Sequence, residues 1–415
     1  MSVRASMDAD TATDAVLLKL DRNIFHHGGL GVIRSLGRLG IRVHAMREDR
    51  FTPAGVSRYA RRTMSPMPAR AHPDDVLDLL DRLADGLPGP AVLVTTDDAG
   101  AIFLAEHGDK LRPRYLFPDP PADLPRRAAG KATLAEICRA AGVPHPATVV
   151  PVDAAEATAF ADSCGYPVVA KVNLPWAADR TVGVQSTTIV RGRDELLGLV
   201  ERARRATGDG PDTGLLLQEY LAPAPTGTRQ DWFFHGYFDT ASRCLFGHTG
   251  IKERSFPVNA GLTTYGRWVP NDRLRAEAVA LLSGLGYQGV VDLDYRWDPR
   301  DDSYRLLDFN PRLGAQFRLF QDTAGIDAVR ALHLDLTGRG FTPGDAVPGR
   351  ALVVENFDPL AALGYRREGT LSTRSWLASL RAADEAAWFA RDDLAPFFLS
   401  GARTLWQAAK NRLSR

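Results

Sequence analysis

The stretch GVVDLDYRWDPRDDSYRLLDFNPRLGAQFRLF, residues 289–320, predicts a β-hairpin that carries polar side chains on one face. Apolar and polar residues alternate on both sides of a turn at residues 298–302, as they do in strands. Side chains two positions apart share a face of a strand. The spacing therefore places two polar groups together on the first strand and three on the second, namely Asp292 and Asp294, then Asp308, Asn310 and Arg312.

These side chains are suited to a metal ion and a phosphate. Carboxylate and amide oxygens are hard ligands of the kind that hold Mg²⁺, whose other ligands are waters and substrate phosphates. A guanidinium on the same face can neutralise a phosphoryl or acyl-phosphate group. The alternative is a solvated surface of Asp and Arg. Apolar residues between the polar ones indicate that the hairpin is half-buried, where clustered carboxylates are costly without a cation.

Size and composition are those of a soluble enzyme. A chain of 415 residues allows two or three domains with substantial cores, and 45% hydrophobic and 24% charged residues are ordinary values. A formal net charge of +1 predicts no bulk attraction to nucleic acid or to a membrane, and no apolar run approaches the about 20 residues of a membrane span. Residues 1–14 are expected to form a disordered tail rather than a signal peptide. Three widely spaced cysteines argue against a disulfide framework or a zinc site, so a cytoplasmic enzyme is the simplest class.

The first 120 residues predict a small parallel α/β domain. Two strand candidates, residues 15–20 and 41–46, flank an apolar-periodic helix, and a helix over 74–83 precedes a strand at 91–94. Strands and helices alternating at this spacing are typical of a parallel sheet. Residues 113–125 are proline-rich and are expected to form a domain linker.

Glycines at the start of the first helix suggest a dinucleotide site, but the pattern is incomplete. Gly29 and Gly31 open the helix and Glu48 follows the second strand, while Arg34 stands where the third glycine of the fingerprint belongs. Two further interpretations stay open. The glycines allow a tight turn, or the helix N-terminus holds a substrate carboxylate.

Beyond the linker the chain alternates helices and strands. The predicted elements are a helix over 128–141 that stops at Gly142, a strand at 167–172, a helix at 194–205, strands at 215–221, 232–238 and 244–251, a polar loop at 259–264, and helices at 272–285 and 325–336. The tail from about residue 342 begins polar and becomes helical.

Several motifs in this order resemble the ATP-grasp superfamily. They are Lys131, Lys171, the run Gln218-Glu219-Tyr220-Leu221, Lys252, Asp294 and the run Asp308-Phe309-Asn310-Pro311-Arg312. More narrowly, the chain resembles the carboxylate–amine ligases of that group, including peptide ligases of actinobacterial natural-product pathways. The resemblance covers about residues 15–340 and rests on the spacing of several motifs.

The resemblance implies an α/β and α+β architecture. It consists of a pre-ATP-grasp α/β domain at 15–120 and an ATP-grasp domain at 121–341, in which two α+β subdomains clamp ATP. A lid subdomain is implied at about 148–214, followed by a partly helical C-terminal extension at 342–415.

The resemblance also assigns roles to nucleotide-binding residues. Lys131 and Lys171 match the two lysines that contact the phosphates. The hinge that reads adenine corresponds to Gln218 and Glu219, with backbone groups of Tyr220 and Leu221. Asp231 matches a ribose-hydroxyl acceptor. Each assignment has a structural alternative. The two lysines could be solvated surface residues, Gln218 and Glu219 could form an ordinary strand edge, and Asp231 could be a turn residue.

The remaining matches concern the metal and the reaction. Asp294, Asp308 and Asn310 match the metal ligands, and Asp292 falls on a neighbouring substrate-facing position. Arg312 matches the arginine beside the transferring phosphate, and Lys252 and Arg254 lie where acyl-phosphate contacts are common. Gln316 and Arg318 either bind substrate or pack against Asp308.

Two departures from the family pattern stand out. The loop over the phosphates is usually rich in Gly and Ser, whereas residues 173–183 hold a single glycine, and Arg180 would have to contribute instead. The two metal-binding acids are both Asp, where Glu is common at the second.

The implied reaction is ATP-dependent amide or peptide bond formation through an acyl phosphate, with ADP and phosphate released. ATP and Mg²⁺, or Mn²⁺ in its place, are the implied cofactors. A small-molecule carboxylate and an amine, such as amino acids or peptides, are the implied partners, without nucleic acid or membrane; a homodimer is the default assembly. The alternatives are a kinase or carboxylase-type enzyme that makes an acyl phosphate without an amine, and a non-catalytic nucleotide-binding protein.

Overall fold

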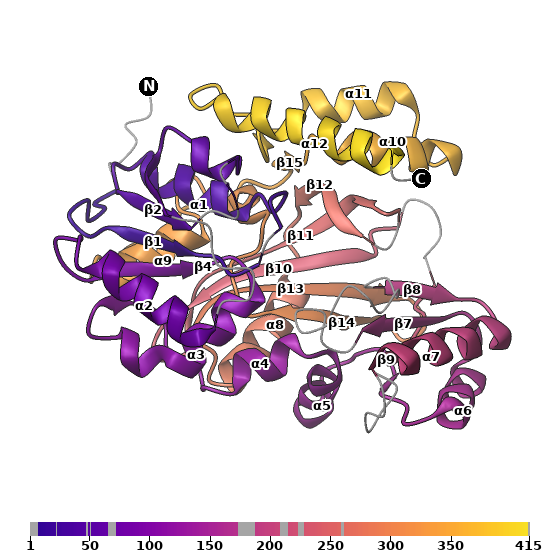
Figure 1. The fold of residues 1–415 in the computed structure, drawn as a ribbon. Coiled ribbons are helices and arrows are strands. Elements are labelled where there is room, and N and C mark those ends of the chain that lie inside the picture. Colours follow the sequence, from indigo (N-terminus) through magenta and orange to yellow (C-terminus); the bar gives the residue numbers. More distant parts are fainter. Residues whose placement is uncertain are drawn as a thin grey trace. The chain divides into compact units, whose positions relative to one another are not determined.

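The computed structural model describes residues 7–21, 23–46, 49, 51–64, 72–172, 187–207, 215–222, 228–258 and 261–413 (Figure 1). The chain forms two compact units. Unit 1 comprises Met1–Pro125, Phe233–Asp292 and Asn310–Arg415, and unit 2 comprises Arg126–Trp232 and Leu293–Phe309. The expected phosphate loop at 173–183 lies outside the described residues.

A five-stranded parallel sheet forms the N-terminal part of unit 1. Its strand order is β3-β2-β1-β4-β5, from β1 (Ala15–Leu18), β2 (Val43–Met46), β3 (Ala60–Met64), β4 (Ala91–Thr95) and β5 (Tyr115–Leu116). The alternation of side chains along β1 supplies two cores. Ala15 and Leu17 pack with helices α1 (Gly28–Gly37) and α9 (Ala328–Leu336), whereas Val16 and Leu18 pack with α2 (Pro73–Ala84) and α3 (Asp98–Leu111). The predicted parallel α/β domain is confirmed.

A second sheet has seven strands, in the order β14-β13-β10-β11-β12-β15-β16. They are β10 (Asp231–Phe238), β11 (Cys244–Phe256), β12 (Leu262–Trp268), β13 (Gly289–Asp298), β14 (Ser303–Asn310), β15 (Ala351–Val353) and β16 (Glu385–Ala386). The hairpin predicted from residues 289–320 is the neighbouring pair β13 and β14. Helix α8 (Asp272–Gly284) precedes it.

The polar loop predicted at 259–264 is wrong at its second half. Residues 259 and 260 lie outside the described residues, and β12 begins at Leu262. Thr263 and Thr264 are consecutive and both buried, so both faces of the strand are covered there. Threonine is polar, which suggests a loop, but its β-branched side chain favours a strand.

Unit 2 contains a four-stranded antiparallel sheet of order β6-β9-β7-β8. Its strands are β6 (Thr148–Val149), β7 (Val168–Val172), β8 (Thr187–Val190) and β9 (Leu215–Glu219). Helices α6 (Ala154–Cys164) and α7 (Arg193–Thr207) share its core.

The helix predicted at 128–141 is two helices, α4 (Leu124–Ala129) and α5 (Lys131–Ala141). Gly130 separates them with extended backbone, and a Cβ there would lie 2.5 Å from the Thr133 hydroxyl oxygen. Lys131 is therefore the first residue of α5, so the start of this helix sets the position of its side chain. The predicted stop at Gly142 is confirmed, because its φ of 67° is the left-handed value that glycine tolerates.

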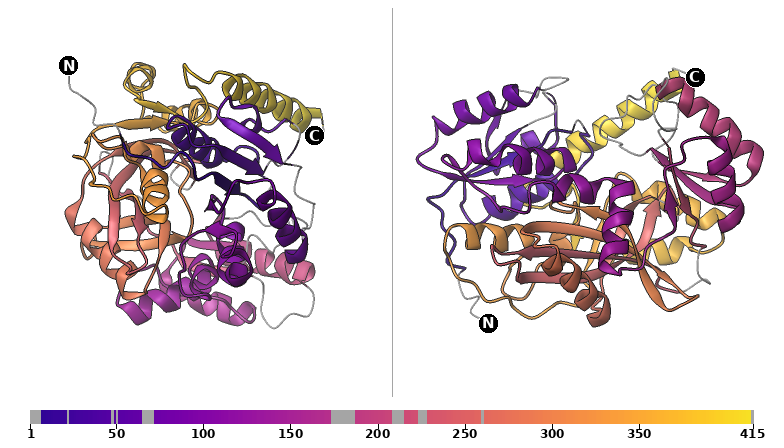
Figure 2. Two further views of the ribbon diagram at one scale, coloured as in Figure 1. Left: turned by 90° about the vertical axis from the view of Figure 1, so that its left-hand side faces the viewer. Right: turned by 90° about the horizontal axis from the view of Figure 1, so that it is seen from below.

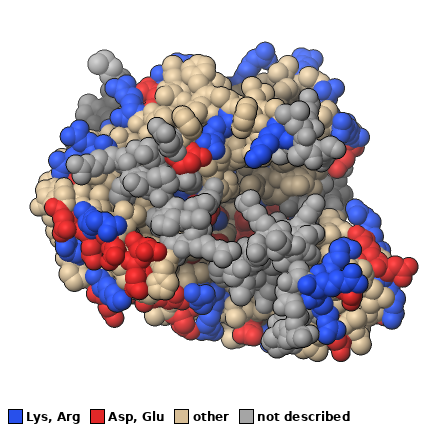
Figure 3. Space-filling view, in the orientation of Figure 1, with Lys and Arg blue, Asp and Glu red and all other residues tan. Residues whose placement is uncertain are grey.

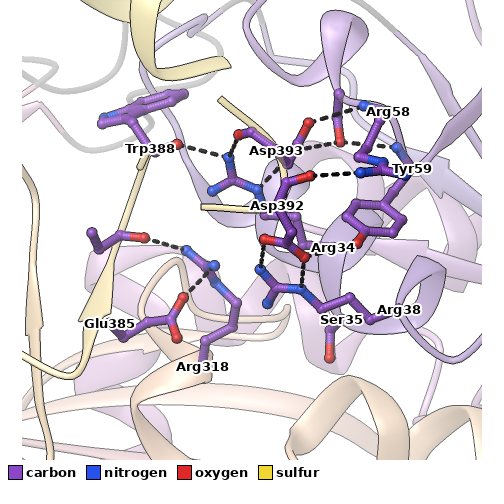
Figure 4. Close-up of polar contacts among 12 residues, drawn as sticks. Arg34, Ser35, Arg38, Arg58, Tyr59, Arg318, Glu385, Trp388, Asp392 and Asp393 are labelled. Carbon is purple, nitrogen blue, oxygen red and sulfur yellow. Dashed lines mark hydrogen bonds and ion pairs between the residues drawn. The ribbon is translucent and has the colours of Figure 1, made fainter. Parts of the chain in front are cut away.

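The C-terminal extension belongs to unit 1 and contains α10 (Asp358–Arg367), α11 (Thr373–Arg381) and α12 (Ala395–Leu413). A buried and a partly exposed ion pair hold it against α1 (Figure 4). Arg34 of α1 donates to the Asp393 carboxylate at 3.0 Å and to the Trp388 carbonyl at 2.7 Å. Arg38 forms two 2.9 Å bonds with Asp392. Arg34, which breaks the dinucleotide fingerprint, thus has a structural partner.

Among the described residues, no helix combines the length and hydrophobicity that crossing a bilayer requires.

Candidate active site

Unit 2 brings together four of the residues that the resemblance implies for nucleotide and metal. Lys131, at the start of α5, forms an ion pair with Asp308 near the end of β14, 177 positions away. Lys171 lies on β7 opposite Leu216 of β9. Burial lowers the pKa of Lys171, and the charge of Lys131 lowers it further, whereas the nearby Asp308 and Asp294 carboxylates oppose the shift. Two ammonium groups and two carboxylates therefore act on one another within one unit.

The donor set fits a hard divalent cation. Asp294 and Asp308 supply carboxylate oxygens that both act on the Lys171 ammonium, so both lie near one point. No group of three or more His, Cys, Asp or Glu able to hold a metal occurs in the part of the chain that the structure describes. The cation would accordingly have two carboxylates and, if Asn310 contributes, one amide oxygen, with its remaining positions left to water or phosphate.

Replacement of Lys171 by Met is expected to raise the KM for ATP about tenfold or more, because the resemblance implies that Lys171 is one of two cations that contact the phosphates. The free energy of unfolding should not fall, since burial already disfavours the ammonium that is removed. Steady-state kinetics over a range of MgATP concentrations measures the first effect and urea unfolding the second. Lys110→Met, at an exposed position of α3, is the control; equal KM values in both variants would contradict the assignment.

The run expected to read adenine is held by contacts of the fold. The Gln218 amide donates to the Thr148 hydroxyl at 3.2 Å across the β6–β9 pair. Glu219 accepts from the Ala147 N–H at 3.2 Å and forms an ion pair with Arg300 at 2.7 Å. Base recognition by these two side chains would require these contacts to be exchanged, so the backbone groups of Tyr220 and the N–H of Leu221, whose carbonyl accepts from Arg296, are the simpler candidates.

Asp231 is also engaged in this structure. Its carboxylate accepts from Arg296 at 2.7 Å, and Arg296 also donates to the Leu221 carbonyl at 3.0 Å. Arg296 therefore links the segment after β9 to the start of β10. Nothing in the sequence indicates this role of Arg296, because its two partners lie 65 and 75 positions away.

Unit 1 holds the other part of the predicted set, a buried charged cluster centred on Asp292. Arg312 donates to Asp292 at 3.0 Å, and His235 of β10 lies 3.1 Å from the same carboxylate. Burial is the largest influence on the pKa of Asp292 and would raise it, but His235, Arg312 and Lys252 together outweigh it and hold the pKa well below its usual value. The Asp292 carboxylate is therefore ionised, and it holds the Arg312 guanidinium in place through their ion pair.

Two more contacts complete this cluster. The Asn310 amide donates to the Asp292 carbonyl at 3.1 Å, which turns the amide nitrogen toward β13. Arg312 also lies 3.5 Å from Asp98 at the start of α3. His235 was not expected from the sequence. Its only signal in the sequence is its place within an otherwise mainly apolar strand, β10, whose residues 232–238 are all buried.

Arg254 lies in a different environment from Lys252. Its guanidinium donates to both carboxylate oxygens of Asp358, at 2.7 and 3.0 Å, and both side chains are buried. Asp358 also accepts from the Trp376 indole at 2.8 Å and from Thr264 at 3.1 Å. This geometry favours a structural role for Arg254 in place of the acyl-phosphate contact expected from the sequence.

Arg318 likewise serves the C-terminal extension. It donates to Glu385 at 2.5 Å and to the carbonyl oxygens of Ala386 and Ala387 (Figure 4). Neither of the two roles expected for Arg318, substrate binding or packing against Asp308, matches these contacts. The sequence could not indicate these contacts, because about 70 residues separate Arg318 from its partners.

The glycines at the start of α1 serve close packing. A Cβ on Gly31 would lie 2.8 Å from the Phe317 ring, and one on Gly28 would lie 2.8 Å from His26. Gly29 and Gly31 do not have a positive φ, so a left-handed turn does not require glycine at either position. Phe317, the first residue of the 3-10 helix Phe317–Phe320, occupies the space that a side chain at Gly31 would need.

Three histidines of unit 1 are held neutral by burial. It lowers the pKa of His26 to about 3 and that of His248 to about 4, and that of His27 well below its usual value; nearby arginines act in the same direction. Asp97 has the opposite effect on how stability depends on pH, because burial raises the pKa of its carboxyl group to about 6. The unfolded chain protonates the histidines near pH 6.5, while the folded chain does not.

The free energy of unfolding is therefore expected to fall by about 3 kcal/mol between pH 7 and pH 5.5. Each of the three histidines accounts for a loss of about 1.2 kcal/mol in this range, because the unfolded state takes up the proton first, and Asp97 returns somewhat less than 1 kcal/mol. Urea unfolding at several pH values tests this. His248→Phe should flatten the slope, whereas a replacement of the exposed His72 by Phe should leave it unchanged.

The chain is similar to several known proteins of low sequence identity. No family model matches the chain. The D-aspartate ligase of Enterococcus faecium is 22% identical over 234 residues, which are 54% of this chain and 53% of that protein. The chain thus spans about half the length of this curated relative.

Two solved structures show the fold. The N5-carboxyaminoimidazole synthetase of Staphylococcus aureus, complexed with ADP, has a TM-score of 0.60 at 12% identity, over 88% of this chain and 87% of that one. The biotin carboxylase domain of the 2-oxoglutarate carboxylase of Hydrogenobacter thermophilus, with MgADP, ADP and bicarbonate, has a TM-score of 0.54 at 18% identity, over 81% and 72%. The chain has the ATP-grasp fold, as the resemblance implied.

Proposed function

We propose that the protein is an ATP-dependent carboxylate–amine ligase that forms an amide or peptide bond through an acyl phosphate, releasing ADP and phosphate. The observation that carries this proposal is the cluster of Lys131, Lys171, Asp294 and Asp308 in unit 2. Such a set of two cations and two carboxylates suits a nucleotide phosphate with its metal ion.

The roles of these residues follow from their charges. Lys131 and Lys171 would bind the phosphates of the nucleotide and spread the charge of the transferred group. Asp294, Asp308 and Asn310 would hold Mg²⁺, which when bound neutralises phosphate charge and draws the phosphates into line. Because Lys131 pairs with Asp308 in this structure, this ion pair must loosen when nucleotide and metal arrive.

Arg312 is proposed as the cation beside the transferred phosphoryl group. Asp292 and Asp98 contact it in unit 1, and His235 contacts Asp292 in turn, so the guanidinium is oriented before any substrate binds. An oriented donor stabilises developing negative charge without a cost for reorganisation at the moment of reaction. Lys252, whose charge reaches Asp292, is the second cation proposed for the acyl phosphate. The amine then displaces phosphate from the activated carboxyl carbon.

The substrate class is proposed from the relative. The name D-aspartate ligase describes an enzyme that joins an amino acid, which supports an amino acid or a peptide as the carboxylate or the amine here. Carboxylation is the second candidate, because one of the similar structures is a carboxylase complexed with bicarbonate. That likeness concerns the fold, so the two reactions need a direct test.

The test is ADP release by the purified chain with MgATP against paired amino acids and dipeptides, followed by mass spectrometry of the products. A ligase gives ADP only when carboxylate and amine are both present, together with a product whose mass equals their sum less one water. ADP formation that depends on bicarbonate and needs no amine would instead establish carboxylation. MgATP binding by calorimetry without ADP from any pair would establish a non-catalytic nucleotide-binding protein. NAD(H) should produce no thermal shift, whereas MgATP should.

A further inference from the structure

A cavity of about 300 Å³ lies in unit 1, where β11 begins and where the chain passes from β12 to α8. Its walls are residues 245–249, Trp268, residues 270–272 with Arg275, and Pro343 with Ala346. Figure 2 shows α8 lying along the seven-stranded sheet, where it contacts β11. The described residues that line the cavity include none of those proposed for the reaction. Its volume is at the lower end of the range for ligand pockets, so it suits one small molecule rather than a nucleotide.

A histidine and two aromatic rings form one wall of the cavity. The centroid of the His248 ring lies 4.6 Å from that of Phe246 and 4.6 Å from that of Trp268. Burial lowers the pKa of His248 to about 4, and the nearby Arg275 charge acts in the same direction, so the imidazole is neutral at pH 7. Among the described residues, neither nitrogen of this ring has a hydrogen-bond partner. The wall therefore offers apolar surface with one neutral polar group.

Two opposite charges border the cavity on the first turn of α8. Asp272 and Arg275 lie three positions apart, which makes them neighbours on the helix surface, and both are exposed. The Arg275 Nε donates to the Gly247 carbonyl at 2.9 Å, so the guanidinium is held at the start of β11 while its two terminal nitrogens can bind another group. Within the ranges that the structure describes, Asp272 and Arg275 form no ion pair with each other or with a third residue. Both charges are thus available to a ligand.

Charged side chains alone do not define a site. In Figure 3 Lys and Arg are interspersed with Asp and Glu over the face that is drawn, and on α8 itself Arg273 pairs with Glu277 at 3.0 Å. Asp272 and Arg275 differ from these residues because both line a cavity with an aromatic wall. A purely apolar occupant would take water from both charges without replacing it, and a simple anion would face the Asp272 carboxylate. A molecule that carries an ammonium, a carboxylate and an apolar group satisfies all three features.

We propose that this cavity binds a free amino acid with an apolar side chain. Arg275 binds the carboxylate of the amino acid, and Asp272 binds its ammonium group. The side chain of the amino acid packs against the wall that His248 forms with Phe246 and Trp268.

This site is separate from the charged cluster around Asp292. The Phe320 ring lies 5.9 Å from the His248 ring and 5.3 Å from the ring of His235, which contacts Asp292. Phe320 thus contacts a residue of each site, while neither His235 nor Asp292 lines the cavity. Binding of the amino acid requires no ATP and does not depend on the proposed ligase reaction.

The experiment is isothermal titration calorimetry of the full-length chain with leucine and with phenylalanine, each in its L and D forms and without ATP. Binding of at least one of them is expected. Glycine should bind at least about tenfold more weakly, because it has both charges but no side chain to bury. The compounds 4-methylpentanoate and 3-methylbutylamine are leucine without its ammonium and leucine without its carboxylate. Each should also bind at least about tenfold more weakly than leucine, because one charged hydrogen-bond partner is lost.

Two variants and a matched control locate the bound amino acid. Arg275→Gln and Asp272→Asn should each raise its Kd about tenfold or more, whereas Arg273→Gln, at an exposed position of the same helix, should leave the Kd unchanged. Circular dichroism and thermal unfolding verify that each variant folds.

Absence of binding of both leucine and phenylalanine at millimolar concentrations overturns the proposal. Equal binding of 4-methylpentanoate and leucine also overturns it, because the ammonium group would then have no partner in the site. An unchanged Kd in Arg275→Gln would place the ligand elsewhere, such as in the cluster around Asp292, and would overturn it as well. Because calorimetry reads binding without turnover, failure here does not bear on the ligase reaction.

Discussion

Replacement of Asp308 by Asn is expected to lower ATP-dependent ADP formation about a thousandfold, which is the scale of losing a group that organises charge around a transferred phosphoryl group. The carboxylate is the proposed metal ligand nearest to Lys131 and Lys171, and an amide of the same shape cannot supply its charge. Stability should change by only about 1 kcal/mol, because the ion pair with Lys131 is partly exposed. Single-turnover ADP formation and urea unfolding measure the two effects.

The control for this prediction lies at the other end of the same hairpin. Asp301 in the turn pairs with Arg305 at 2.9 Å and is exposed, so Asp301→Asn removes a carboxylate from β13–β14 without touching the cluster. It should retain normal ADP formation. Near-normal activity in Asp308→Asn, or an equal loss in Asp301→Asn, would show that the metal site has been assigned to the wrong residues.

The hairpin and the parallel domain could be predicted because their signals are local. Period-two alternation over residues 289–310 depends on near neighbours, and so does the spacing of apolar residues in α1 and α2. The juxtaposition of Lys131 with Asp308 was reached only through the resemblance, since 177 residues separate them. No periodicity in a single sequence carries information over that distance.

Three charged residues near the predicted site have protein partners that the sequence does not indicate. The resemblance assigns Arg254, Asp231 and Glu219 to ligand contacts, and these roles stay predictions. In the structure each has an ion-pair partner on another element, respectively Asp358, Arg296 and Arg300. A charged residue buried during folding needs a counter-charge, and the sequence does not say whether protein or ligand supplies it.

Replacement of Arg254 by Met is expected to lower the free energy of unfolding by about 3–5 kcal/mol, because the buried Asp358 carboxylate would lose its counter-charge. Trp376 and Thr264 would remain as its hydrogen-bond donors, and these do not neutralise it. Urea unfolding followed by circular dichroism measures the change. The variant also separates the two roles considered for Arg254, because an acyl-phosphate contact predicts lost activity with stability retained.

A matched control exists on the neighbouring strand. Arg267 also forms two bonds to a carboxylate, that of Glu253, and also lies over the Tyr265 ring, but this pair is partly exposed. Arg267→Met should cost no more than about 1 kcal/mol, since water can solvate the remaining carboxylate. Adding Asp358→Leu to Arg254→Met should recover a large part of the loss, because the unpaired charge is then removed. If the double variant were as unstable as the single one, the cost would have to come from lost packing rather than from an uncompensated buried charge.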